Sequence, residues 1–415
     1  MAATGLSAQA RAENVARASY GRLLALLAAP TGNIAAAEDA LGDAFVQALC
    51  RWPRTGVPDN PEAWLLTVAR NRQVDRFRSS ARHRSVSLDA LAEGWSTMDG
   101  ESIPDRRLAL MFVCAHPAID AGIQTPLMLQ TVLGFEAKQI ARAFAIPAPA
   151  MAQRLVRAKR RIRDAKIPFT VPDRDAMPRR LPAVLEAVYG AYAIDWHVVA
   201  GTEVRDSLSA EALYLATTLE ESLEDEPEAT GLAALICLST ARADSRASPG
   251  GSFVPLDRQD ASKWDAALIA HGEAYLHRAH ALGRPGRFQV EAAIQSVHCA
   301  RAVTGKTAWK ELRTLHEALV RIAPTMGAWV SLAATVGEVD GPVAGLEYLD
   351  HLDDTLTQRF QPAWATRAHL LARAGRTDEA RRAFDKAISL TTDASMRAWL
   401  KECREGLAGS AIADL

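Results

Sequence analysis

Residues 136–165 have the pattern of two helices separated by a turn that contains prolines. Residues 136–144 have the composition of a short helix, residues 145–149 that of a turn, and residues 151–165 that of a second helix. On the second helix the apolar residues fall at i, i+4, i+7 and i+11, and so share one face: Met151, Leu155, Ala158 and Ile162. This pattern predicts a helix-turn-helix whose second helix packs on a small core through one face and leaves the other free.

The opposite face of the predicted second helix is polar and basic. No acidic residue occurs from Gln153 to Arg163. Guanidinium and ammonium groups bind phosphates, and Arg and Gln also bind base edges in the major groove. We therefore predict that this helix, with one residue of the preceding helix, reads duplex DNA through Lys138, Gln153, Arg154, Arg157, Lys159, Arg160 and Arg161. A basic helix face taken alone is often only a solvated surface, so the prediction depends on the rest of the chain.

Charge is distributed unevenly along the chain, although the formal net charge is only −1. Residues 70–84 contain six arginines and a single acidic residue, Asp75, whereas an acidic cluster lies far downstream at 220–228. A basic first third on a neutral chain is typical of a nucleic-acid-binding module joined to other domains.

Alanine and leucine are abundant, runs of β-branched residues are almost absent, and Pro and Gly mostly separate periodic segments, which predicts an all-α fold. Early helices are expected at 20–29, at 34–49 (ending before Trp52-Pro53) and from Asn60-Pro61 to Arg78. The five cysteines form no CxxC pair, and no signal peptide or long apolar span is present. We therefore expect a cytoplasmic protein without membrane attachment, metal or other cofactor.

The order of periodic and irregular segments predicts five parts. These are a helical domain at 11–80, a flexible linker at 81–105, a helix-turn-helix domain at 106–166, a further helical domain at 180–285 and helical repeats at 290–405. The repeats are expected because one set of residues has the spacing of a tetratricopeptide unit: Trp364, Ala368, Leu371, Gly375, Ala380, Phe384 and Ala387. A weaker copy runs through Trp329, Ala333, Val336, Gly345 and Leu349.

Two ordered blocks carry a resemblance to a known family. Residues 37–49 followed by 61–78 are similar to sigma region 2, and residues 136–164 are similar to sigma region 4. The first 166 residues thus resemble an extracytoplasmic-function (group 4) sigma factor of the sigma-70 family. The whole chain resembles the subgroup with a C-terminal tetratricopeptide-like helical extension. The resemblance implies a region 2 bundle, a region 4 helix-turn-helix domain and a C-terminal helical solenoid.

The resemblance also implies the partners of each surface. Core RNA polymerase would be bound through its β′ coiled-coil and its β flap, with the β′ coiled-coil facing exposed residues of the 38–49 helix: Glu38, Asp39, Asp43 and Gln47. The melted −10 promoter element would be bound by the 52–60 loop and by Trp64, Arg70, Asn71, Asp75, Arg76 and Arg78. Single-stranded bases are held by stacking, by pockets for flipped bases and by neutralised phosphates. The −35 duplex would be read by the helix that carries Arg154 and Arg157.

The function predicted is promoter-specific transcription initiation, with the C-terminal helices regulating or supporting it and offering a surface for a protein partner. No nucleotide-binding, metalloprotease or hydrolase motif is present, so an enzyme is not expected. Two alternatives stay open. One is a helix-turn-helix regulator with a peptide- or protein-sensing repeat domain, which binds duplex DNA alone. The other is a repeat-protein adaptor whose first helices only look like sigma regions.

Overall fold

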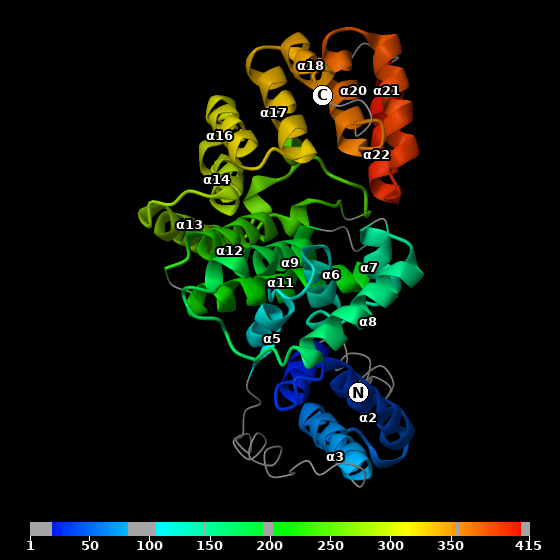
Figure 1. The fold of residues 1–415 in the computed structure, drawn as a ribbon. Helices are drawn as coiled ribbons and strands as arrows, with labels where there is room; N and C mark the ends of the chain where they lie inside the picture. Colours follow the sequence, from blue (N-terminus) through cyan, green and yellow to red (C-terminus); the bar gives the residue numbers. More distant parts are fainter. Residues whose placement is uncertain are drawn as a thin grey trace, which may run out of the picture. The chain divides into compact units, whose positions relative to one another are not determined.

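The computed structural model of this chain describes residues 19–81, 105–144, 146–193, 202–223, 225–248, 250–352 and 357–407. Figure 1 shows helices joined by loops, and within the described ranges the β-pairing consists of one isolated bridge between Ala247 and Phe253. The predicted all-α class is therefore confirmed. The chain divides into two compact units, residues 1–208 and 209–415. The predicted 81–105 linker lies almost wholly outside the described residues.

The first unit begins with a helical segment at 19–28, α2 (Ile34–Thr55) and α3 (Pro61–Ala81). The side chain of Asn60 accepts a hydrogen bond from the Ala63 amide (3.0 Å), so α3 begins as predicted. The predicted end of α2 before Trp52-Pro53 is wrong. The helix continues because the Trp52 indole is buried at 2% exposure, and the Gly56 amide closes the last turn on the Trp52 carbonyl. The free energy gained by burying the indole ring offsets the cost of the backbone hydrogen bond that Pro53 cannot donate.

The 19–28 segment joins α3 to the next group of helices, α5 (Arg107–Cys114) and α6 (Ala121–Thr131). The Gln73 side chain of α3 donates to the Leu27 carbonyl (3.3 Å). On the other side, a Cβ added to Gly21 would lie 1.9 Å from the carbonyl oxygen of Val132, which directly follows α6. Only glycine permits this approach, so close packing holds the two groups of helices together.

The predicted helix-turn-helix is formed by α7 (Ala137–Ala143) and α8 (Ala148–Asp164), which pack on each other. Glu136 begins α7 with a capping box, its amide donating to Gln139 Oε1 (2.8 Å). The structure starts α8 at Ala148, three residues earlier than predicted, because Pro149 falls in the first turn where a missing N–H costs nothing. All four residues of the predicted apolar stripe are buried. Helix α9 (Leu181–Ala193) covers α5 and α6.

The second unit begins within α11 (Thr202–Ser222), which spans the boundary. Its first helices are α12 (Pro227–Thr240), α13 (Ala266–Ala281) and α14 (Arg287–Cys299). The later helices are α16 (Trp309–Ile322), α17 (Met326–Val339), α18 (Pro342–Asp350), α20 (Gln361–Arg373), α21 (Thr377–Leu390) and α22 (Ala394–Gly406). From α14 onward each of these helices packs on the next one along the chain (Figure 1).

The residues with repeat spacing lie where paired helices cross. Ala368 and Leu371 of α20 share one core with Ala380 and Phe384 of α21. In the weaker copy, a Cβ added to Gly345 would lie 2.7 Å from the Ala333 carbonyl oxygen. The spacing of small residues therefore marks true helix crossings in this unit, as expected for stacked helical pairs.

Two histidines, the buried His316 and the partly buried His298, should make the stability of the second unit depend on pH. Burial lowers the pKa of His316 on α16 to about 4, and burial, Arg242 and His316 lower the pKa of His298 to about 4. The unfolded chain has a histidine pKa near 6.5, so it binds more protons below that pH. Stability is then complete above pH 6.5 and decreases as pH falls toward 4, by about 2 kcal/mol per histidine at pH 5.

Urea unfolding at pH 7.5 and pH 5 measures this effect. His316→Leu should remove about half of the loss of unfolding free energy between pH 7.5 and pH 5. The buried Nδ1 of His316 has no hydrogen-bond partner among the described residues, so the substitution breaks no hydrogen bond of that atom. Replacing His271, which is exposed on α13, with leucine is the control and should leave the pH dependence as it is. Equal losses in wild type and His316→Leu would show that His316 does not carry the effect.

Candidate nucleic-acid and polymerase interface

The basic face of α8 is open to solvent. Gln153, Arg154, Arg157, Arg160 and Arg161 are all exposed and lie off the buried stripe. Arg160 is directly opposite Met151, whereas Arg154 and Arg161 lie at the edge of the stripe. None of the described residues forms an ion pair with these four arginines. Lys138 on α7 is also exposed. The face thus presents uncompensated cations, which favour a polyanionic ligand.

Three of these arginines surround one hollow in the surface. Arg154, Arg157 and Arg161 line a concavity of about 430 Å³, whose other wall includes Ile119 and Asp120. Guanidinium groups that converge from successive turns of one helix can contact neighbouring phosphates or base edges of a duplex.

Lys159 does not belong to this exposed face. It lies about 80° around the helix from Met151, beside the buried stripe, and only 8% of it is exposed. Its Nζ donates to both carboxylate oxygens of Glu38 on α2, at 2.5 and 2.6 Å. The expectation that Lys159 and Glu38 are both exposed is therefore wrong. Sequence separation explains the error, since the partners are 121 residues apart.

This ion pair is largely buried. Burial raises the pKa of Glu38 more than attraction to Lys159 lowers it. Burial, with repulsion from Glu38, also raises the pKa of Tyr20, and burial raises the pKa of the Cys114 thiol to about 12. Because both groups are largely buried, each charge is balanced chiefly by the other, and removing one partner leaves a poorly compensated charge.

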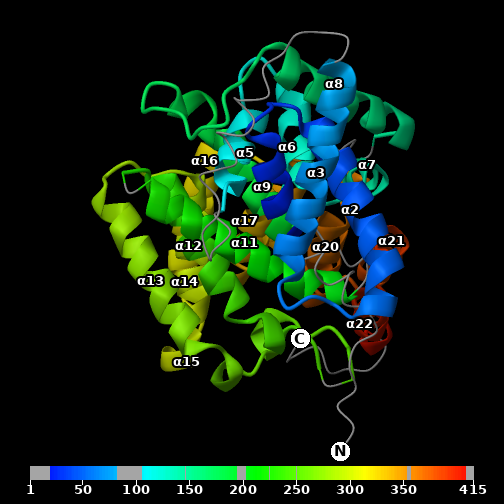
Figure 2. The same cartoon turned by 90° about the horizontal axis from the view of Figure 1, so that it is seen from below.

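The acidic face of α2 meets α3. Asp39 and Asp43 pair with the Arg76 guanidinium at 3.1 and 3.3 Å, and α2 and α3 lie side by side in Figures 1 and 2. Between 45% and 67% of each of these side chains is exposed, so the pairs contribute little to stability. The predicted polymerase-binding and −10-binding residues thus adjoin one another on the surface.

Helix period separates Arg76 from the other −10 candidates on α3. Trp64, Asn71, Asp75 and Arg78 recur at i, i+7, i+11 and i+14 and share one face, whereas Arg76 lies about 120° away and faces α2. Asn71, Asp75 and Arg78 are exposed, and Arg70 is half-buried. Among the predicted −10-binding residues, Arg76 therefore lies on the α2 side of the helix, apart from the face that carries Trp64.

Two contacts near these sites were not predicted from the sequence, and one of them changes the predicted 52–60 loop, because residues 52–55 belong to α2 and Trp52 is buried. The buried Trp52 contacts Trp64 edge-on, with ring centroids 5.5 Å apart, and so holds the Trp64 ring in place. Arg72 approaches Gln47 of α2 at 3.1 Å, with the amide oxygen of Gln47 accepting. Arg72 lies four residues before Arg76 and therefore on the same face of α3, and this spacing could have indicated a second basic residue facing α2.

Comparison with known proteins agrees with this geometry. Residues 15–83, which contain α2 and α3, match sigma-70 region 2. The chain thus carries a sigma-70 region 2 domain, which supports a sigma-70 family sigma factor. Members of this family are transcription initiation factors rather than enzymes, and region 2 supports binding to core RNA polymerase and promoter DNA. Residues 180–280 match DUF6596, a family of unknown function.

An uncharacterized protein of Rhizobium meliloti (strain 1021) is 36% identical over 378 residues, which cover 89% of each chain. The likeness of the two proteins therefore extends well beyond region 2. No solved structure matches the chain. Over the described parts of the chain, no helix is both long and apolar enough to span a bilayer, and no three His, Cys, Asp or Glu side chains gather as metal ligands.

Proposed function

We propose that the chain is an extracytoplasmic-function (group 4) sigma factor with a C-terminal tetratricopeptide-like extension. The proposal rests chiefly on one combination. A sigma-70 region 2 at 15–83 is in the same chain as the exposed Arg154, Arg157, Arg160 and Arg161 of α8, which form no ion pair with any described residue. In this role α8 reads the −35 duplex, the Trp64 face of α3 holds the melted −10 strand, and α2 binds the β′ coiled-coil. The second unit regulates or supports these contacts and offers its repeats to a protein partner.

The docked arrangement of α2 and α8 limits when this factor can act. The −10 and −35 elements are about 25 base pairs apart, which is roughly 85 Å of duplex at 3.4 Å per base pair. Region 2 and α8 touch through Glu38 and Lys159, so in this arrangement they do not reach both elements. Opening of the Glu38–Lys159 contact is therefore part of promoter binding in this proposal.

The proposal is tested with purified full-length protein, core RNA polymerase and a set of promoter fragments that includes the upstream region of the protein's own gene. Abortive transcripts that require the protein would support it. A second form that ends at residue 208, the boundary of the compact units, shows whether the second unit is required or restraining. Tight duplex binding without polymerase and no transcript from either form would favour the helix-turn-helix regulator, and neither binding nor transcript would favour the adaptor.

Asp39→Asn with Asp43→Asn should weaken the affinity for core polymerase about tenfold, because two carboxylates are removed from the predicted β′-facing side of α2. Fold stability should change by less than about 1 kcal/mol, since the ion pairs to Arg76 are half-exposed. Fluorescence anisotropy of labelled protein titrated with core polymerase measures the affinity. The exposed Asp175 serves as control, and Asp175→Asn should bind like wild type. Unchanged affinity of the double variant would remove this surface from the proposal.

A further inference from the structure

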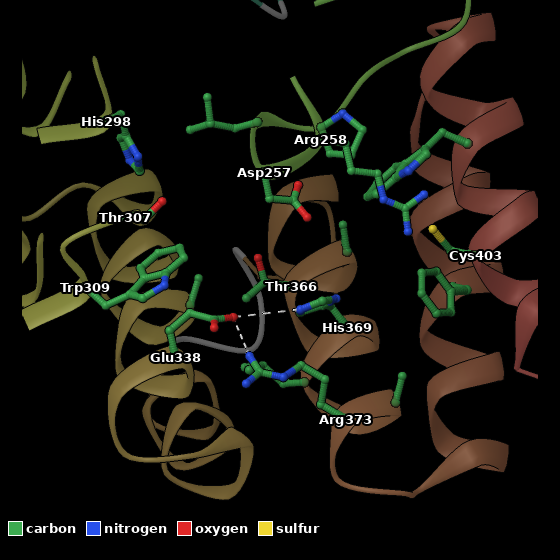
Figure 3. A pocket seen from close by; sticks show the side chains of 18 of the residues that line it. Asp257, Arg258, His298, Thr307, Trp309, Glu338, Thr366, His369, Arg373 and Cys403 are labelled. Carbon is green, nitrogen blue, oxygen red and sulfur yellow. Dashed lines mark hydrogen bonds and ion pairs between the residues drawn. The ribbon is translucent and has the colours of Figure 1, made fainter. Parts of the chain in front are cut away.

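The second unit contains a cavity of about 540 Å³ between the 255–258 segment and helices α16, α17, α20 and α22 (Figure 3). This volume is typical of sites for small organic ligands. The cavity has no part in the DNA-binding or polymerase-binding surfaces, which lie in the first unit.

The ionised groups on its walls leave one positive charge in excess. Arg258, Arg301 and Arg373 face two acids, Asp257 and Glu338. The histidines do not add to this charge at pH 7, because burial and nearby arginines lower the pKa of His298 to about 4 and lower that of His369. A cavity of this charge favours a monoanion over a neutral or cationic ligand.

The three arginines differ in how strongly they are already held. Arg373 forms an ion pair with Glu338, whose carboxylate also lies 4.0 Å from His369 Nε2 (Figure 3). Arg301 donates to the Gln259 carbonyl (2.8 Å) and stacks on the Trp264 ring. Arg258 is exposed and has no ion-pair partner among the described residues. Arg258 is therefore the guanidinium that a ligand can engage without breaking an existing pair.

Aromatic and apolar side chains form the rest of the lining. The Trp309 indole points into the cavity and remains 36% exposed, which is unusual for so large an apolar ring (Figure 3). Trp399 on the far side is fixed edge-on by Phe253, with ring centroids 5.3 Å apart. An apolar body placed here would cover indole surface that is now in contact with water.

We propose that this cavity binds a monovalent carboxylate on an apolar body, with the carboxylate at Arg258 and the body against Trp309. A free aromatic or aliphatic acid and the C-terminus of a peptide both present this chemistry. The inference goes beyond the proposed transcription function and does not depend on it.

Isothermal titration calorimetry on the full chain tests the site with two matched pairs of probes. One pair is indole-3-propionate and its uncharged amide, and the other is N-acetyl-Ala-Ala-Phe as free acid and as C-terminal amide. A ligand of this size in a good site should bind with a Kd on the order of 1 mM or tighter. Each acid should bind about tenfold more tightly than its amide, because only the acid forms a charge-assisted pair. Binding of the indole acid alone identifies a small molecule, and binding of the peptide acid alone identifies a chain terminus.

Variants assign the contacts. Arg258→Ala should reduce the affinity for the acid about tenfold and leave the affinity for its amide unchanged, whereas Trp309→Ala should reduce both affinities. Arg381→Ala removes an exposed arginine of α21 outside the cavity and should change neither. The proposal would be overturned if acid and amide bound equally tightly, if Arg258→Ala bound the acid as tightly as wild type, or if no probe bound.

Discussion

Replacing Arg154 and Arg157 together with alanine is expected to reduce promoter-specific transcription by about 30-fold or more. Both side chains are exposed, have no ion-pair partner among the described residues, and line one hollow on α8. A well-placed arginine contact to a base contributes about 1–3 kcal/mol, so two such contacts account for this loss. Abortive transcription with core polymerase on a fixed promoter measures it.

The salt dependence separates base contacts from phosphate contacts. The slope of log affinity against log salt should become less steep by about one for each phosphate that the double variant no longer neutralises. Arg163→Ala is the matched control, because Arg163 lies on the same helix but already pairs with Asp164 at 2.7 Å. The control should transcribe like wild type. A double variant with full activity and an unchanged −35 preference would show that α8 is not the recognition helix.

Local periodicity was sufficient to predict the helices that carry these arginines. The stripe of Met151 and Leu155 and the capping residue Asn60 depend on neighbours within four residues along the chain, and the structure has them as expected. The extension of α2 past Pro53 was not predictable in this way. It depends on the contact between Trp52 and Trp64, which tertiary packing alone brings together.

Packing between distant segments was also beyond the sequence pattern. Lys159 has the charge and the sequence position expected of a DNA-facing residue. Glu38 has the charge and position expected of a polymerase-facing residue. Only the approach of α2 to α8 shows that each is buried against the other. Gly21 gave no local signal either, since the carbonyl group that requires a glycine there belongs to Val132. The sequence could therefore identify surfaces but not the contact that covers two of their residues.

Replacing Lys159 with glutamate should separate α8 from α2. The change places a second carboxylate beside Glu38 in a largely buried contact, and an uncompensated buried charge costs about 3 kcal/mol or more. That cost shifts the balance between docked and separated states by roughly 100-fold. Combining Lys159→Glu with Glu38→Lys restores opposite charges and should restore docking, as a double-mutant cycle would report.

The separation is measurable by electron–electron double resonance between spin labels on the native Cys50, which is exposed at the end of α2, and on an Ala165→Cys variant at the end of α8. The other cysteines are buried. The parent protein should give a narrow distance distribution, Lys159→Glu a longer and broader one, and the charge-swapped protein a narrow one again. Identical distributions in all three proteins would show that the ion pair does not hold the two helices together.

Gly21→Ala tests what separation does to function, because it leaves the surfaces of α2 and α8 chemically unchanged. Its methyl group would lie 1.9 Å from the Val132 carbonyl oxygen, so the 19–28 segment is forced away from α6. Gly42→Ala is the matched control, since a Cβ there meets nothing within 4 Å. If docking restrains the factor, only the separated state binds core polymerase, and the apparent Kd of the parent protein is the intrinsic Kd divided by the separated fraction. Gly21→Ala should then bind core polymerase more tightly than Gly42→Ala by up to the reciprocal of that fraction. Equal affinities of two variants that retain their helical circular dichroism would mean that docking does not restrain polymerase binding.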